Sequence, residues 1–435
     1  MKNKQLYFPM LLVAMSLGTA WAIRGQFGHE YGAAWAGAVG TLSILFVARR
    51  TDWYAKLFGA ILAGAIGWGL GGIASYGILV GYGRGDDFIN VYYGLLMLFV
   101  VGGLYGYVGG GLFGLALADS PQKPVKWHEI TVEMVVGAAV AYFFLIEEFE
   151  WYMTPPRSEM WAAVFGAAAA LTWYLIRNNH TSALRVAAFS GLGGGFGFAF
   201  GNFLQVLGGL TGIKFNFWNV MEYSLGFFGG LGMAYGTFTS EWERTTDSQP
   251  KSKTWFPLLM SMLFIPYVVW EQSFSVERLQ DIFSKLDFTP ESDIYRTIQL
   301  VALACVLLMA VLWWVRYYLT KTNPLSYSAS EVYALFLGHW GLYVVYSLLV
   351  TGAFLSSYRI EQYLYIVNWV IVAVLIRKAE VSFAPRAIDL SKWGKNFVFV
   401  IASIALLTLI LINSHGELKN SHKRFGAPPP VEEKK

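Results

Sequence analysis

Apolar segments long enough to cross a membrane recur along the whole chain. A transmembrane helix needs about 20 consecutive, mostly apolar residues. We count thirteen segments that approach this length, at residues 5–23, 31–48, 57–82, 91–117, 130–146, 159–176, 186–208, 217–238, 255–270, 298–316, 330–352, 362–376 and 396–413. The pattern predicts an all-α, polytopic integral membrane protein with about 13 (12–14) transmembrane helices.

The composition agrees with this prediction and excludes several classes of function. Charged residues make up 14% of the chain, against about 25% in an ordinary soluble domain, and apolar residues make up 56%. The net charge of +4 is small and spread out, so we expect no nucleic-acid partner. The single cysteine excludes an intrachain disulfide, and the six histidines are isolated from one another. We therefore predict no metal site and no cofactor, and a lipid bilayer as the main partner.

Basic residues in the loops predict the orientation, because lysine and arginine favour cytoplasmic loops. With the N-terminus inside, nineteen basic residues fall in the inner segments and eight in the outer loops. We predict a multi-pass protein of the plasma (inner) membrane with a cytoplasmic N-terminus. Thirteen spans would place the C-terminal tail outside, whereas one re-entrant segment would return it to the cytoplasm. Residues 1–22 also fit a cleavable signal peptide, with Ala20-Trp21-Ala22 as the cleavage site.

The chain matches itself at an offset of 127–129 residues. Glu30–Gly37 aligns with Glu159–Gly166, and Gly67–Gly69 aligns with Gly195–Gly197 in the same order. Each copy contains four spans, an even number, so the duplication would be a parallel repeat. We predict a first repeat at residues 1–117, a second at 129–240, a C-terminal helical bundle of about five spans at 255–413, and a polar, disordered tail at 414–435.

Glycines four residues apart mark several predicted spans, for example Gly67 with Gly71 and Gly193 with Gly197. Small residues at this spacing let helices approach closely in a membrane. We interpret them as packing seams, either within the chain or toward a second copy or a partner subunit.

Polar side chains next to apolar segments are costly, and by default they indicate a site or a pairing. Most of them collect at the predicted outer ends of the spans. The candidates for binding a substrate are Arg24, Gln26, His29, Glu30, Asn202, Gln205, Asn219 and Glu222, with Trp68 and Trp151 as stacking faces. The candidates for carrying a proton or a coupling ion are His29, Glu30, Glu147, Glu150 and Glu222. The competing interpretations are helix–helix hydrogen bonds and solvated loop charges.

Three functions fit this pattern. The first is a secondary transporter of a small polar solute, such as a sugar or a sugar acid, coupled to protons or sodium through an outward-facing cavity at the repeat interface. The second is an integral membrane transferase with an outward-facing site, in which His29 or a glutamate acts as general base on a lipid-linked or exported substrate. The third is a non-catalytic membrane subunit. The first predicts a protein without catalytic residues, and the second an enzyme.

Overall fold

The computed structural model describes residues 4–28, 30–244, 251–286, 291–323, 325–355, 359–387 and 389–426. Over these residues the chain folds into helices joined by short connections, without a strand. The first ten helices are α1 (Lys4–Arg24), α2 (Tyr31–Ala48), α3 (Thr51–Ala55), α4 (Leu57–Gly72), α5 (Gly77–Tyr82), α6 (Phe88–Ala118), α7 (Trp127–Tyr142), α8 (Trp161–Arg177), α9 (Thr181–Leu210) and α10 (Phe217–Phe238). They are followed by α11 (Trp255–Leu259), α12 (Ile265–Ser273), α13 (Val276–Phe283), α14 (Ser292–Trp314), α15 (Ala329–Thr351), α16 (Glu361–Leu375) and α17 (Leu390–Ser414).

Eight helices in the described part of the chain are long and apolar enough to cross a membrane, which is compatible with a membrane protein. They cover Leu6–Arg24, Tyr31–Ala48, Phe88–Ala118, Trp127–Glu148, Thr181–Leu210, Asp293–Leu319, Ala329–Thr351 and Ser391–Ser414. Leu57–Gly72 and Trp161–Arg177 are shorter apolar helices. The all-helical prediction is confirmed, while thirteen membrane crossings remain a prediction.

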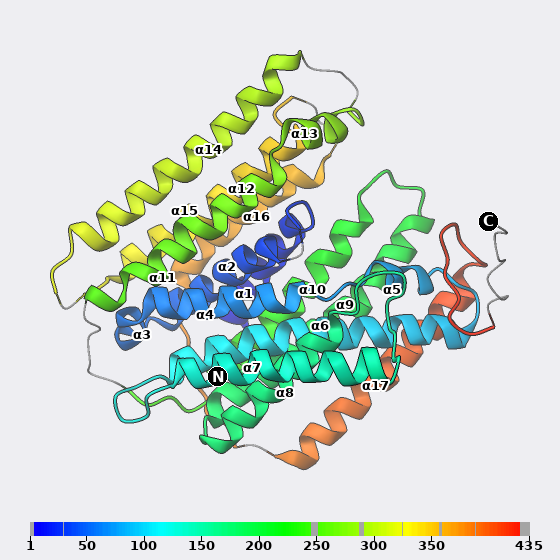
Figure 1. Ribbon diagram of the computed structural model, residues 1–435, viewed down its shortest axis with the longest axis horizontal. Helices are drawn as coiled ribbons and strands as arrows, with labels where there is room; N and C mark the ends of the chain where they lie inside the picture. The colour runs from blue at the N-terminus through cyan, green and yellow to red at the C-terminus, as the bar shows by residue number, and fades with distance from the viewer. Residues whose placement is uncertain are drawn as a thin grey trace.

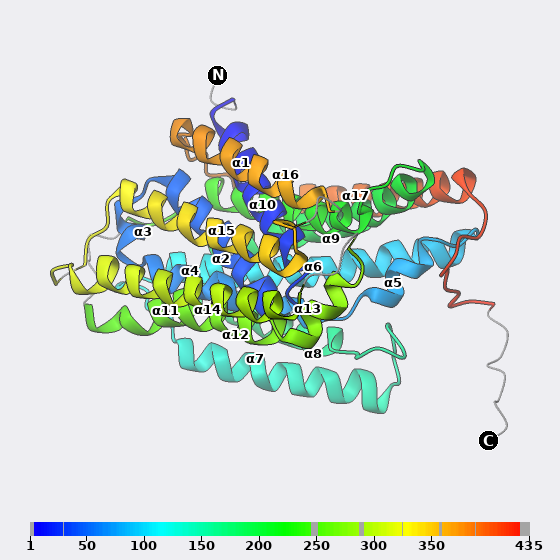
Figure 2. The ribbon, with the colours of Figure 1, turned by 90° about the horizontal axis from the view of Figure 1, so that it is seen from above.

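Helices α1 and α2 lie in the core, and other long apolar helices lie at the periphery. Within its most apolar stretch, α2 has 94% of its residues buried, against 17% for α7 and for α17. In Figure 1, α14 lies at the upper edge and α17 at the lower edge, and Figure 2 places α7 at its lower edge. Figure 2 also shows α1 entering from the top and running into the middle of the bundle. The exposed apolar faces of α7, α14 and α17 are therefore the surfaces available to lipid.

Glycine seams bring the central helices into close contact. A Cβ atom placed on Gly71 of α4 would lie 2.6 Å from the Cα of Tyr105 on α6. On Gly197 of α9 it would lie 2.5 Å from the carbonyl oxygen of Ser224 on α10. Real Cβ contacts are not this short, so these positions require glycine. At both positions the partner is another helix of this chain.

The segment expected to be one span at residues 57–82 is two helices. Helix α4 ends at Gly72, and α5 begins at Gly77 after a connection over residues 73–76. Glycine has a low helix propensity, and the pair Gly71-Gly72 weakens the helix at this point. At this break the side chain of Tyr76 turns into the protein interior, where it is 3% exposed.

The last helix does not pack with the group that precedes it in sequence. Helices α11 to α16 form one group at the upper left of Figure 1, against α1 and α2. Helix α17 instead packs against α6 and α9, through a cluster that includes Ile404 and Leu411. The segments that the sequence groups into one C-terminal bundle therefore lie in two places.

Loops expected on the same side of the membrane contact one another. At one end of the bundle, Arg278 donates to the carbonyl of Gln26 at 2.6 Å. At the other end, Arg49 donates to the carbonyl of Arg377 at 2.6 Å, and Arg386 N–H donates to the carbonyl of Thr239. We call these the outer and inner ends, after the predicted orientation.

The tail beyond α17 lies at the outer end. The side-chain oxygen of Asn90 accepts the backbone N–H groups of Arg424 and Phe425, and the N–H of His422 donates to the carbonyl of Gly81 at 3.2 Å. Of the tail expected to be disordered, residues 415–426 are thus placed against α5 and α6. Residues 427–435 lie outside the described residues.

Candidate functional site

A buried ion pair joins the end of α1 to α10. The guanidinium Nη1 of Arg24 lies 3.4 Å from the carboxylate of Glu222. The two side chains are only 1% and 0% exposed. Moving opposite charges out of water costs several kcal/mol per ion, so such a pair needs good geometry and further hydrogen bonds.

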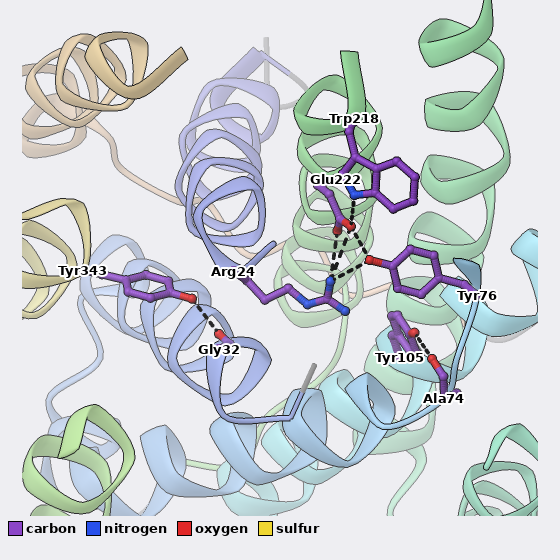
Figure 3. A network of polar contacts seen from close by, with 8 residues as sticks. All are labelled: Arg24, Gly32, Ala74, Tyr76, Tyr105, Trp218, Glu222 and Tyr343. Atoms are coloured by element: carbon purple, nitrogen blue, oxygen red, sulfur yellow. Dashed lines mark hydrogen bonds and ion pairs between the residues drawn. The ribbon is translucent and has the colours of Figure 1, made fainter. Parts of the chain in front are cut away.

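Two neutral donors complete the surroundings of the carboxylate (Figure 3). The hydroxyl of Tyr76 accepts from Arg24 Nη1 at 2.9 Å and donates to Glu222 at 2.5 Å. The indole N–H of Trp218, one helical turn before Glu222, donates to the same carboxylate oxygen at 3.2 Å. Glu222 is therefore held by one cation and two uncharged donors from three separate segments.

Aromatic rings enclose the Arg24 guanidinium. Its central carbon lies 5.1 Å from the ring centroid of Trp21 and 5.5 Å from that of Tyr76. Both distances are within the range of a cation–π interaction. Tyr105 packs against Trp21 at 5.7 Å and donates its hydroxyl to the carbonyl of Ala74, just before Tyr76. The rings keep water away from the pair and hold the connection that carries Tyr76.

A cavity of about 310 Å³ lies directly over this pair. Its lining in the described part of the chain is Arg24, Gly25, Gly28, Ser75, Tyr76, Gly77, Arg157 and Trp218. Glu222 lies behind the lining: a Cβ atom added to Gly25 would be 3.8 Å from its Cγ. Gly28 has φ +87°, a left-handed conformation that favours glycine. The lining residues thus carry two guanidinium groups, two aromatic rings and two hydroxyls.

A compact loop between α7 and α8 brings Arg157 to the cavity. The carboxylate of Glu159 is 6% exposed and accepts the backbone N–H groups of Met153 and Thr154 at 2.8 and 2.7 Å. It also accepts the indole N–H of Trp161 at 2.7 Å. The N–H of Arg157 itself donates to the carbonyl of Thr154. Glu159 thus folds the loop whose tip contributes Arg157.

The residues predicted around the α1–α2 connection have different surroundings. Arg24 is at the floor of the cavity, whereas the side chain of Gln26 points to α15 and accepts the hydroxyl of Ser347 at 2.7 Å. Glu30 is exposed just before α2. His29 lies outside the described residues.

The predicted amides lie near the cavity but do not line it. Asn202 donates to the side-chain oxygen of Gln205 at 3.0 Å, and both are buried on α9 beside α5. Asn219 donates to the hydroxyl of Tyr365 at 2.7 Å and lines a second space, of about 240 Å³, between α1, α10 and α16. Asn202, through the carbonyl of Val80, and Asn219 thus form helix–helix hydrogen bonds, the competing interpretation, while the bond between Asn202 and Gln205 lies within α9.

The remaining candidates lie away from the ion pair or in the core beneath it. Trp68 is fully buried, and its ring packs 5.0 Å from that of Trp21. Trp151 is 61% exposed and packs on Phe149. Glu147 and Glu150 are exposed where the helix that begins as α7 ends. The structure therefore brings together Arg24 and Glu222, and places the other described candidates outside the cavity lining.

Sequence reasoning missed three residues that line the cavity. Ser75 and Tyr76 were hidden in a segment taken as one continuous span, although glycines on both sides of this polar pair signal a break. In the sequence, Arg157 is only one of the eight basic residues in the outer loops, and nothing marks it as part of a site. Trp218 lines the cavity as well, and its contact with Glu222 follows from the i, i+4 spacing on α10.

No known protein family, curated protein or solved structure matches this chain.

Proposed function

We propose that this chain is a secondary transporter of a small polar solute, with sugars and sugar acids as the first candidates, and that the cavity above Arg24 and Glu222 is its binding site. One observation carries the proposal: a fully buried arginine–glutamate pair lies beneath a cavity at the meeting point of α1, α10 and the α4–α5 connection. Charged groups inside a membrane protein are expensive, and those that occur mark substrate or ion pathways by default.

The size and lining of the cavity support a small solute. Its volume of about 310 Å³ is at the lower end of the range for small-molecule pockets, about 300–1,000 Å³. In this proposal the rings of Trp218 and Tyr76 provide faces for the solute, and Ser75 and Arg157 provide polar contacts. Glu222 is the coupling group, because it is the carboxylate that contacts the buried cation.

The proposed topology keeps the orientation and the duplication expected from the sequence. The N-terminus is cytoplasmic in an inner or plasma membrane, thirteen segments cross it, and the cavity opens to the outside. Helix pairs α1–α2 and α7–α8 correspond in the proposed repeat, as do α4–α6 and α9–α10; each pair is in contact. A solute site where the two copies meet is the usual arrangement in transporters with internal repeats.

The outward-facing transferase is the second candidate. The position of the cavity at the outer end favours it, but an acid–base mechanism needs a general base within reach of the substrate. Within the described residues, the lining contains no aspartate, glutamate or histidine, while His29, the base suggested by the sequence, follows the lining residue Gly28 and lies outside the described residues. The third possibility is a subunit that binds a partner through its glycine seams. Where these seams already contact helices of this chain, a partner would have to bind another surface.

Uptake into proteoliposomes tests the transporter, with a panel of labelled sugars and sugar acids and with or without a proton gradient. Gly77→Phe should abolish uptake, because Gly77 lines the cavity and an added Cβ meets nothing within 4 Å. Gly59→Phe is the matched control, since Gly59 is equally open but lies at the inner end of α4. Absence of uptake for every solute, or equal uptake by both variants, would overturn the proposal.

A further inference from the structure

The space of about 240 Å³ between α1, α10 and α16 is a second cavity, and it shares no lining residue with the one above Arg24. Helix α1 contacts both α10 and α16 (Figure 2). Glu361, Tyr365 and Asn368 follow one another on α16 at spacings of four and three residues, so they lie on one face of the helix. All three line the cavity. A polar face among apolar helices by default indicates a site or a pairing.

Pairing accounts for the neutral members of this polar face. The hydroxyl of Tyr365 accepts from the amide of Asn219 on α10 at 2.7 Å. The amide of Asn368 donates to the hydroxyl of Thr19 and, at 3.3 Å, to the carbonyl of Met15, both on α1. These hydrogen bonds join α16 to the two neighbouring helices, and none of them involves Glu361.

Glu361 is a buried carboxylate without a cation. Its side chain lines the cavity, although the residue is only 4% exposed. Among the described residues it accepts one hydrogen bond, from the amide of Asn216 at 3.1 Å. None of the ion pairs within that part of the chain involves Glu361 or Arg359, which precedes it by two residues. A buried charge without a partner is strongly unfavourable, so the open side of this carboxylate favours a cation in the cavity.

The rest of the lining favours an organic cation over a metal ion. The rings of Phe215, Tyr223 and Tyr365 line the cavity together with aliphatic side chains such as those of Val220 and Leu364. Aromatic faces attract ammonium groups, and organic ligands bind in largely apolar pockets that contain a few placed polar groups. Divalent cations such as calcium need six or more oxygen ligands. The described residues contain no group of three acidic, histidine or cysteine side chains that could hold a metal ion.

We infer that this cavity binds a small protonated amine, with the ammonium group at the carboxylate of Glu361 and the apolar body against the three rings. Glu361 is the first residue of α16, at the predicted outer end. The amine can therefore be a free solute or the headgroup of an amino-phospholipid. The site is separate from the cavity above Arg24 and does not depend on the proposed function.

Calorimetric titration of the purified full-length protein in a maltoside detergent, which contains no amine, tests the inference at neutral pH. The ligands are matched pairs: phenethylamine with phenethyl alcohol, and cyclohexylamine with cyclohexanol. At least one amine should bind more tightly than its alcohol. Glu361→Gln should weaken that amine about tenfold or more, as expected for a lost hydrogen bond to a charged group, and leave the alcohol unchanged. Glu271→Gln, which changes an exposed glutamate of α12, is the matched control and should have no effect.

An ammonium group tethered to the protein gives a second test, which does not depend on the folding of Glu361→Gln. Leu364 lines the cavity, is 50% exposed and lies three residues after Glu361, on the same side of α16. Leu364→Lys should therefore occupy the carboxylate and abolish binding of the amine, whereas Leu364→Met, of similar length and without charge, should keep it.

Addition of phosphatidylethanolamine identifies the source of the amine. Displacement of the bound amine by this lipid assigns the site to a headgroup, and binding that persists assigns it to a free solute. Equal affinity for amine and alcohol, no binding of either amine, or amine binding that survives Glu361→Gln or Leu364→Lys would overturn the inference. These outcomes leave solute uptake through the cavity above Arg24 as a separate question, which Gly77→Phe decides.

Discussion

Two arginine–glutamate pairs near the two ends of α2 have the same geometry and opposite surroundings. Arg24, seven residues before α2 begins at its outer end, lies 3.4 Å from Glu222, and Arg49, directly after α2 at its inner end, lies 3.4 Å from Glu380. The first pair is 1% and 0% exposed, and the second is 38% and 80% exposed. The distance between charges therefore does not distinguish a buried pair from a surface pair. Burial does, because water screens the second pair and not the first.

The segments that provide the partners also differ. Glu222 comes from α10, and its hydrogen bonds join α1, α10 and the α4–α5 connection. Glu380 comes from an extended segment after α16, where Arg49 also donates to the carbonyl of Arg377. The outer pair therefore joins three segments that are far apart in the sequence, whereas the inner pair fastens a loop to the surface.

Glu222→Ala should give the largest loss of stability. It leaves the Arg24 charge buried without its carboxylate, which costs roughly 3–5 kcal/mol. The thermal midpoint of the detergent-solubilised protein should fall strongly, and the double variant Arg24→Met with Glu222→Leu should recover most of the loss. A small effect of Glu222→Ala would mean that water reaches the pair, and the contrast between the two ends would disappear.

Lys56 tests whether burial of charge is confined to the outer end. Its ammonium group, just before α4, donates to the carbonyls of Leu117 and Asp119 at 2.6 Å each. Burial lowers the pKa of Lys56 to about 8, although Asp119 opposes this shift. An unfolded lysine has a pKa of about 10.4. Between these values the unfolded chain keeps a proton that the folded chain has released, so the free energy of unfolding should rise with pH across this window.

Thermal midpoints measured from pH 7.5 to 10 check this prediction. Lys56→Met should remove the rise, whereas Lys285→Met, which changes an exposed lysine, should keep it. Identical pH profiles for the two variants would show that the inner end buries no lysine charge.

Glu380→Ala should have the smallest effect. Exposed ion pairs contribute about 0–1 kcal/mol, and Glu380 is 80% exposed, so the thermal midpoint should hardly change at any salt concentration. A loss comparable with that of Glu222→Ala would show that the extended segment after α16 encloses its charges in the membrane-embedded protein.

Several helices can be predicted well from local sequence, because glycines and polar loops interrupt the runs of apolar residues and mark where a helix ends. The segment expected at 31–48 coincides with α2 (Tyr31–Ala48), and the one at 217–238 coincides with α10 (Phe217–Phe238). An arginine and a glutamate at the ends of such runs, Arg24 and Glu222, could be selected because charge beside apolar segments is rare. Asn202, Gln205 and Asn219 were selected by the same rule, but in the structure they form hydrogen bonds between helices or within one helix.

By itself, the sequence determined that this chain is helical and apolar, where most of its long helices lie, and which few charges lie next to apolar segments. These properties depend on contacts between neighbours in the chain, such as the low propensity at Gly71-Gly72. Only the tertiary structure decided that Arg24 pairs with Glu222, nearly two hundred residues away, and that Tyr76 and Arg157 join the same cavity. Such pairings depend on which helices pack together, and every buried face of similar apolar helices looks alike in sequence.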